Sequence, residues 1–256
     1  MNIYIAISCL LAGYLLGSVL FTRIVLQIKD RDNFDEDIEV PVPGTDMSYK
    51  VKARGATAAS MKYGTKTGLL ISALDMLIIF IPTLLLRIFY PGQPYMFIYA
   101  AAGMAGHNWP IYFGFKGGRG VSSYYGGLFA IDPIGALVTM GAGMILGFAI
   151  LKDYFIAYMA GLWLLLPWAI FKDTRPWYII YAVVINIFYI IAMIPDFRQY
   201  IKIKKTVNVD PSMVLETNPM GRGMIKMSNW FRKVFHIKSK GDGKQQVQSD
   251  EYNKDR

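Results

Sequence analysis

The sequence reads Gly106-His107-Asn108-Trp109-Pro110 and then Phe115-Lys116-Gly117-Gly118-Arg119-Gly120-Val121, with long apolar runs on both sides. Basic side chains and glycine-rich backbone at the end of a membrane helix are costly unless they meet an anion or water. Glycine allows backbone N–H groups to turn toward an anion, and a helix that starts near Val121 adds the positive end of its dipole. The two motifs therefore predict a phosphate site at a membrane surface, with His107 as a general base or phosphate ligand and with the binding residues Lys116, Gly117, Gly118, Arg119 and Gly120. The alternative is an interfacial turn with snorkelling basic side chains and a buried histidine whose polar atoms are satisfied.

The composition indicates a membrane protein. Of the 256 residues, 54% are hydrophobic and 18% are charged, and the mean hydropathy is +0.33; a soluble domain of this length carries more charge and fewer long apolar runs. Cys9 is the one cysteine and there are two histidines, so we expect no zinc site, no other metal site and no cofactor. The net charge of +9 indicates an anionic lipid surface as partner and no nucleic acid.

The apolar runs predict an all-α polytopic membrane protein. Six runs are long enough to span, and a seventh at 121–131 is short enough to be a half-span or a tilted helix; the six lie at 3–28, 67–90, 94–112, 134–151, 154–171 and 176–195. The first run lacks a basic start and a cleavage site, so we expect a retained helix. Small residues at Gly17-Ser18 indicate a helix crossing, and Arg23 is expected to snorkel to the inner face.

The distribution of Lys and Arg sets the orientation of the chain. The loop 29–66 holds seven of these residues and the tail from Arg198 holds thirteen. Cytoplasmic loops carry the excess of Lys and Arg, so both regions belong on the cytoplasmic side. Seven transmembrane segments, one of them short, satisfy this rule with the N-terminus outside and the C-terminus cytoplasmic. Six segments would place the two basic regions on opposite faces.

Two domains are expected, an integral membrane domain over 1–205 and a basic cytoplasmic tail over 206–256. Apolar and basic residues alternate over 220–238 in a way that fits an amphipathic helix in the membrane interface. The polar end of the tail is expected to be disordered. The acidic run at 30–39 is most simply a solvated, mobile loop.

A second group of candidate binding residues lies just before the second span: Arg54, Gly55, Thr57 and Lys62. Small residues let a ligand lie on the backbone, although a helix start with a close helix contact explains the same pattern. Asp75 lies inside the following span, where a carboxylate is costly and usually paired; Arg54, Lys62, Lys66 and His107 are possible partners. Asn186, in the last span, is expected to make an interhelical hydrogen bond.

With its motifs in this order, the chain resembles the bacterial membrane acyltransferase family that uses acyl phosphate to acylate glycerol 3-phosphate (PlsY-type). The family pattern runs Gly-Ser-x-Pro-Phe, then Ser-Gly-Asn-x-Gly-Ala-Thr-Asn, then Gly-His-x-Phe-Pro and Phe-Lys-Gly-Gly-Lys-Gly-Val. The matching residues here are Gly17-Ser18-x-x-Phe21, Gly55-Ala56-Thr57, Gly106-His107-x-Trp109-Pro110 and Phe115 to Val121, with Asp75 at the family's aspartate in the second helix. The resemblance covers roughly residues 3–205.

The chain departs from the family pattern at two places. Val51-Lys52-Ala53 replaces Ser-Gly-Asn, Ala58 replaces the following asparagine, and Met61 replaces an arginine, with Lys62 beside it. In the region 196–204, Tyr200 replaces an asparagine of the family's C-terminal motif. The phosphate-binding half of the family's site is thus retained, whereas its other polar half is eroded.

The resemblance implies acyl transfer from acyl phosphate to the 1-hydroxyl of glycerol 3-phosphate, giving lysophosphatidate, in phospholipid synthesis at the bacterial inner membrane. Two anionic substrates need two basic sub-sites: Lys116, Arg119 and the glycine backbone for one, and Arg54, Lys62 and Arg198 for the other, with His107 assisting deprotonation. One alternative is a catalytically altered or inactive relative that binds a lipid or phosphate ligand or acts in a membrane complex. A transporter is the other, but the sequence shows no internal repeat.

Overall fold

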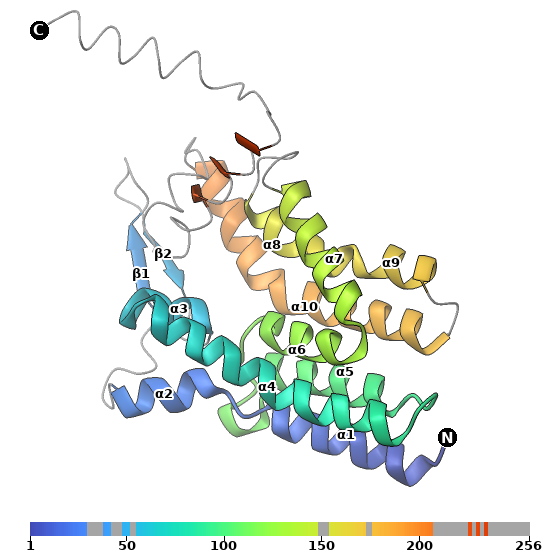
Figure 1. Ribbon diagram of the computed structural model, residues 1–256. Coiled ribbons are helices and arrows are strands. Elements are labelled where there is room, and N and C mark those ends of the chain that lie inside the picture. The colour runs from blue at the N-terminus through green and yellow to red at the C-terminus, as the bar shows by residue number, and fades with distance from the viewer. Residues whose placement is uncertain are drawn as a thin grey trace, which may run out of the picture.

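The computed structural model describes residues 1–29, 38–41, 48–51, 55–147, 154–172 and 176–206, together with the pairs 225–226, 229–230 and 233–234. Helices dominate this part of the chain (Figure 1). Its elements are α1 (Ile3–Gly17), α2 (Phe21–Lys29), β1 (Ile38–Pro41), β2 (Ser48–Val51), α3 (Ala56–Tyr63), α4 (Thr65–Phe89), α5 (Tyr95–Asn108), the 3-10 turn η1 (Ile111–Phe113), α6 (Val121–Ile131), α7 (Pro133–Met144), α8 (Tyr154–Trp163), α9 (Leu165–Lys172) and α10 (Pro176–Thr206).

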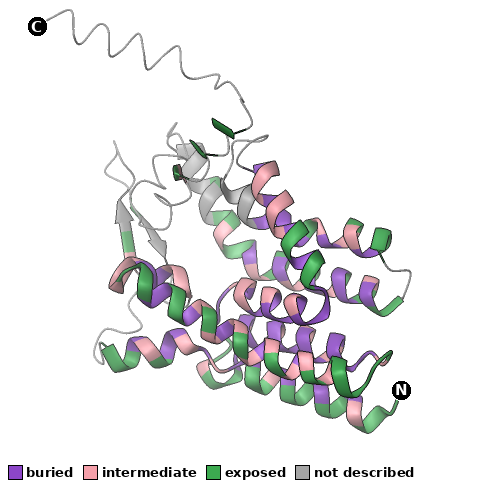
Figure 2. Ribbon diagram, in the orientation of Figure 1, coloured by how far each residue is buried: buried purple, intermediate pink, exposed green. Residues whose placement is uncertain are grey.

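The two short helices α5 and α6 form the centre of the bundle (Figure 1). On one side α1 packs along α5 and α4 packs along α6; on the other, α10 packs on α5, while α7 follows α6 and packs on α8. Eleven of the fourteen residues of α5 are buried, whereas α1, α4 and α10 each have exposed residues (Figure 2). Many of these exposed residues are large and apolar. Apolar faces of this kind suit a lipid environment rather than water.

Membrane-spanning length is confirmed for some of the predicted segments. Three stretches of the described chain are long and apolar enough to cross by themselves, namely Ile3–Lys29, Thr65–Phe89 and Pro176–Arg198. Pro133–Gly147 and Met159–Lys172 are shorter apolar helices. At a rise of 1.5 Å per residue, α5 and α6 are about 21 Å and about 17 Å long, less than the hydrocarbon thickness of about 30 Å. The count of seven segments and the placement of the termini remain predictions.

The first apolar run is not one helix, as predicted, but two. α1 ends at Gly17 and α2 begins at Phe21. Ser18 Oγ donates to the carbonyl oxygen of Tyr14 at 2.7 Å, and Asp75 Oδ1, from α4, accepts a hydrogen bond from Phe21 N–H at 3.4 Å. A carboxylate at the N-terminus of a helix satisfies backbone donors that begin there, so Asp75 stabilises the restart of the chain as α2.

The expectation of an all-α chain is wrong in one place. β1 and β2 pair antiparallel, with Ile38 opposite Val51 and Pro41 opposite Ser48. The sequence carried a signal for this hairpin, since β-branched and aromatic residues flank Pro43-Gly44. Residues 30–37 of the acidic run, and most of the predicted tail helix at 220–238, lie outside the described residues.

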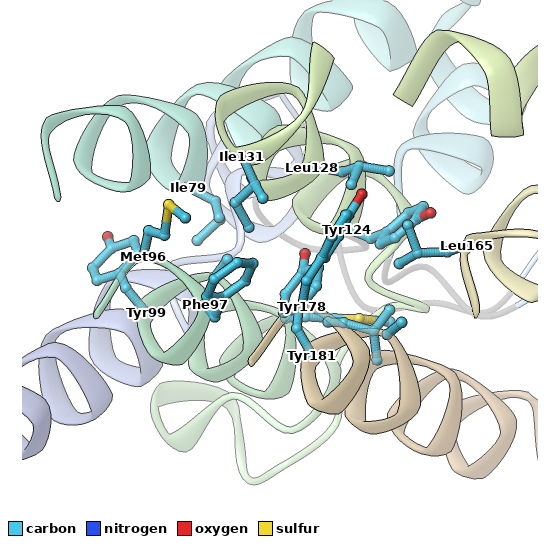
Figure 3. Packing of buried hydrophobic residues seen from close by; sticks show 14 of the residues in the cluster. Ile79, Met96, Phe97, Tyr99, Tyr124, Leu128, Ile131, Leu165, Tyr178 and Tyr181 are labelled. Carbon is cyan, nitrogen blue, oxygen red and sulfur yellow. The ribbon is translucent and has the colours of Figure 1, made fainter. Parts of the chain in front are cut away.

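The main core is rich in tyrosine and joins α5, α6, α9 and α10 (Figure 3). Tyr124 from α6 and Tyr178 and Tyr181 from α10 are buried there, and the ring of Phe97 from α5 stacks on Tyr178 with centroids 5.8 Å apart. Small residues bring α6 close to its other neighbours: a Cβ at Gly126 would lie 3.1 Å from the Cα of Met76 in α4. The core thereby fixes α6, and with it the connection that leads into α6.

Candidate functional site

The connection between α5 and α6 is a tightly folded loop that carries both sequence motifs. α5 ends at Asn108, and Gly114 and Phe115 follow η1 with φ of +59° and +60°. Phe115 N–H donates to the carbonyl oxygen of Pro110 at 2.9 Å, and Gly118 N–H donates to the carbonyl oxygen of His107 at 3.1 Å. These bonds fold the second motif back onto the end of α5. A left-handed phenylalanine costs free energy, so the surrounding contacts must impose its conformation.

The glycines at 117 and 120 are required by close packing of this loop. A Cβ at Gly117 would lie 2.6 Å from Pro110 Cδ and 2.7 Å from the carbonyl oxygen of Asn108. Gly120 has φ of +70°, and its Cβ would lie 2.8 Å from Met104 Cγ. Because Gly118 N–H is already bonded to His107, it is not available to an anion. The predicted cradle of glycine N–H groups therefore reduces to Gly117, Gly120 and the start of α6.

The N-terminus of α6 opens at this loop without a capping side chain. Gly120 is its N-cap, no side chain of the described residues caps the first turn, and the first helical bond runs from Tyr124 N–H to the carbonyl oxygen of Gly120. Asn108 Oδ1 and Ser123 Oγ are buried beside this turn and have no hydrogen-bond partner among the described residues. Unsatisfied backbone donors and the positive end of the helix dipole favour an anion at such a terminus.

The two basic side chains of the second motif have different environments. Lys116 is exposed. Arg119 donates from Nε and Nη2 to the two carboxylate oxygens of Asp196 in α10, and both side chains are partly buried, 23% and 32% exposed. Arg119 is thus paired with a carboxylate that the sequence motif did not reveal, whereas the described residues give Lys116 no ion-pair partner. That both cations bind a phosphate remains a prediction.

His107 lies in the last turn of α5 and is buried, with 5% of its surface exposed. Its backbone carbonyl oxygen accepts the hydrogen bond from Gly118 N–H, which joins the residue that carries the imidazole to the glycine-rich stretch. The neighbouring Trp109 carbonyl accepts from Tyr14 Oη at 2.8 Å. The histidine is thus held at the same end of the bundle as the open start of α6.

The loop between α5 and α6 also contacts residues at the junction of α1 and α2. Ile111 N–H donates to Ser18 Oγ at 3.4 Å, and the guanidinium of Arg23 lies 5.9 Å from the ring centroid of Phe113. Arg23 is 4% exposed, so the prediction that it snorkels to the inner face is wrong. The helix crossing predicted at Gly17 is confirmed, because a Cβ there would lie 2.7 Å from the Cα of Gly103 in α5.

The second group of candidate residues lies on and before α3, which packs on α2 and α4. Arg54 lies outside the described residues. Gly55 is the N-cap of α3 and has open space at its Cβ position, Thr57 is half-buried, and Lys62 Nζ lies 5.6 Å from the ring centroid of Tyr63. The role of these residues as a second sub-site remains a prediction.

Three other polar residues whose roles were predicted from the sequence lie on α4 and α10. Asp75 is buried, and its contact in the described part of the chain is Phe21 N–H rather than Lys62, Lys66 or His107. Arg198 is exposed and lies two residues after Asp196, about 200° around the helix axis from it. Asn186 Nδ2 donates to the carbonyl oxygen of Leu162 at 3.0 Å, so the predicted interhelical bond is confirmed.

Sequence reasoning missed a polar cluster around Asp132, at the opposite end of α6. Its carboxylate accepts from Gly135 N–H at 3.0 Å, Trp168 Nε1 at 2.8 Å and Tyr178 Oη at 3.0 Å, and it pairs with Lys172. Burial raises the pKa of Asp132, but the bonds from Lys172, Trp168, Gly135 and Tyr178 outweigh burial and hold it below the usual value. The Asp132-Pro133 turn was visible in the sequence; its partners 36 to 46 residues away were not.

Comparison with known proteins gives consistent matches. A family model described as glycerol-3-phosphate acyltransferase matches residues 7–203. A glycerol-3-phosphate acyltransferase 3 from Dehalococcoides mccartyi (strain ATCC BAA-2266 / KCTC 15142 / 195) is 31% identical over 191 residues, 68% of this chain and 82% of the relative. A glycerol-3-phosphate acyltransferase from Aquifex aeolicus (strain VF5) is 31% identical over 134 residues, 52% of this chain and 62% of the relative.

The fold is also similar to solved crystal structures. PlsY (YgiH), an integral membrane glycerol 3-phosphate acyltransferase, superposes in its glycerol 3-phosphate form with a TM-score of 0.64 and 24% identity, covering 77% of this chain and 92% of the other. Its lysophosphatidic acid form gives a TM-score of 0.62 at 23% identity with the same coverage. At these identities the likeness concerns the fold.

Proposed function

The chain belongs to the glycerol-3-phosphate acyltransferase family, and from this premise we propose that it transfers an acyl group from acyl phosphate to the 1-hydroxyl of glycerol 3-phosphate. The products are lysophosphatidate and inorganic phosphate. The family makes the chain a membrane acyltransferase of phospholipid synthesis; the acyl phosphate donor and the position of the acylated hydroxyl are our proposal. The single observation that carries it is the uncapped N-terminus of α6, with Lys116 on the loop that leads into it and His107 in the last turn of α5.

The proposed site holds the phosphate of the donor at the start of α6. Backbone N–H groups of the first turn have no helical partner, and the exposed Lys116 supplies a full positive charge. Gly117 and Gly120 let the backbone approach closely in the folded loop. Charge neutralisation at this point stabilises the phosphate as it leaves the acyl group.

In the proposed step the hydroxyl oxygen of glycerol 3-phosphate attacks the carbonyl carbon of the acyl phosphate. The bond from that carbon to the bridging phosphate oxygen breaks, and the electron pair leaves with the phosphate. The hydroxyl proton passes to His107 or to the departing phosphate. A mixed anhydride is already activated, so holding the reactants together and neutralising charge supply much of the acceleration without a protein nucleophile.

The acceptor needs a second cationic sub-site for its phosphate. Three residues carry the required charge and are candidates for it: Arg54, which precedes α3 in the sequence, Lys62, in the last turn of α3, and Arg198, on α10. The basic loop and tail further support a cytoplasmic location of this site, facing the anionic surface of the bacterial inner membrane, with the N-terminus outside.

The test is acyl transfer by the purified full chain with acyl phosphate and glycerol 3-phosphate, read as lysophosphatidate and released phosphate. Lys116→Ala is expected to lower the rate by at least about 100-fold, because it removes the exposed cation at the leaving phosphate. Lys233→Ala makes the same change of charge in the tail and is the matched control. A parent chain that forms no lysophosphatidate while it retains an anionic lipid would replace this proposal with lipid binding alone.

A further inference from the structure

Arg119 and Asp196 join the loop between α5 and α6 to α10. Nε and Nη2 of the guanidinium donate to the two carboxylate oxygens, so the pair is bidentate and fixes the relative orientation of the two groups. Both side chains are partly withdrawn from solvent. A bidentate pair in this setting holds its partners more firmly than an exposed single contact does.

Arg119 occupies a position from which it controls the start of α6. Gly118, just before it, is bonded to the His107 carbonyl, and Gly120, just after it, is the N-cap of α6. Neither neighbour has a side chain that can anchor the loop. Arg119 therefore supplies the side-chain attachment between the glycine-rich stretch and α10.

The other end of α6 is attached to α10 as well. Asp132, the residue after α6, accepts from Tyr178 Oη in α10 at 3.0 Å and pairs with Lys172 at the end of α9. α6 is thus held at both ends, but only the attachment through Arg119 lies at the candidate site. The attachment through Asp132 provides an internal comparison of similar chemistry on the same helix.

We propose that the Arg119–Asp196 ion pair is a positioning device that fixes the open N-terminus of α6 and Lys116 for acyl transfer. In this proposal Arg119 acts through the loop that it holds, instead of contacting substrate phosphate as the sequence motif predicts. The inference rests on the proposed function for its consequence in catalysis. Its structural part, the immobilisation of the loop by the pair, is independent of that function.

The experiment uses the full chain in detergent and compares Arg119→Gln, Asp196→Asn and the charge-exchanged double variant Arg119→Asp/Asp196→Arg. Hydrogen exchange of the Gly118 amide measures loop order, because its bond to His107 protects it. Acyl-transfer kinetics give kcat and the KM for each substrate. Lys172→Gln is the matched control, since it breaks the ion pair at the far end of α6, and Asp196→Glu is the conservative variant that keeps the charge.

Either single variant is expected to speed exchange of the Gly118 amide and to lower kcat about 10- to 100-fold, as small misplacements of catalytic groups do. KM for both substrates should stay within about twofold, since the pair contributes no substrate contact. The exchanged pair and Asp196→Glu should recover part of both losses, and Lys172→Gln should lower thermal stability without a comparable loss of kcat.

Two results would overturn the inference. Unchanged exchange of the Gly118 amide in Asp196→Asn means that the pair does not hold the loop. A rise in KM for Arg119→Gln that Asp196→Asn does not share means that Arg119 binds substrate. If the parent chain forms no lysophosphatidate, the proposed function fails, and the exchange measurement alone decides whether the pair positions the loop.

Discussion

One added methyl group at Gly117 should both destabilise the protein and inactivate it. In Gly117→Ala, the new Cβ lies 2.6 Å from Pro110 Cδ, 2.7 Å from the carbonyl oxygen of Asn108 and closer still to that of His107. Two of these obstacles are backbone atoms, so the loop itself must move by about 1 Å to restore ordinary contact distances near 3.5 Å. That shift breaks the bond from Gly118 N–H to His107, worth about 1 kcal/mol, and overpacking costs about 1–3 kcal/mol more.

The total of about 2–4 kcal/mol corresponds to a fall in Tm of very roughly 5–15 °C for a chain of this size. A shift of about 1 Å of Lys116 and of the start of α6 should in addition lower kcat by about 100-fold. The assays are thermal unfolding followed by tryptophan fluorescence, and lysophosphatidate formation below the Tm of the variant.

Gly141→Ala is the control for this prediction. Gly141 lies inside α7 and has open space at its Cβ position, so alanine there should raise stability by up to about 1 kcal/mol and leave kcat unchanged. The reasoning is refuted if Gly117→Ala retains the parent's Tm within about 2 °C and its full activity, because close packing at the His107 carbonyl would then not constrain the loop.

Two further predictions test the helix attachments. The pKa of Asp132 in the folded protein is held below its usual value of 3.8, so its bonds stabilise the protein fully above that pH, and this contribution is lost as the pH falls below it. Asp132→Asn should therefore flatten the dependence of Tm on pH between about pH 5 and 3. If the variant leaves that dependence unchanged, other groups cause it. Gly106→Ala places a Cβ 2.8 Å from the backbone nitrogen of Ser18, so it should separate α5 from α1 and cost about 2 kcal/mol or more in unfolding free energy, whereas Gly55→Ala, with open space at its Cβ position, should cost much less.

The parts of the fold that follow from short-range patterns were predictable. Apolar length locates α4 and α10, and the Gly17 motif correctly marks a crossing, since only a residue without a side chain lets α1 approach Gly103 so closely. Asn186, polar within a span, makes the interhelical bond that the lipid environment demands. In each case a local requirement, whether span length, close helix approach or a partner for a polar group, determines which residue types stand at those positions.

The features that were missed depend on pairs of residues far apart in the chain. Hydropathy is nearly continuous from Ile3 to Ile28, and the break at Ser18 arises from its bond to Tyr14 and from Asp75, 54 positions from Phe21. Asp196 lies 77 positions from Arg119, so no window along the sequence shows that this arginine is already paired. The motif identifies which residues are present at the site but not which of their charges remain available.

The pairing of Arg119 with Asp196 lowers the net positive charge of the second motif. Read from the sequence, the second motif presents two cations to a phosphate; in the structure Asp196 cancels one of them, and the remaining charge is that of Lys116 together with the helix dipole of α6. In our proposal, a single exposed cation beside a fixed set of backbone donors suits a phosphate that must be bound and then released, since a bidentate arginine would hold the product more tightly. We propose that Asp196 thereby removes Arg119 as a second phosphate ligand and uses it to hold the loop in place, whereas a stronger anion site would slow the departure of phosphate.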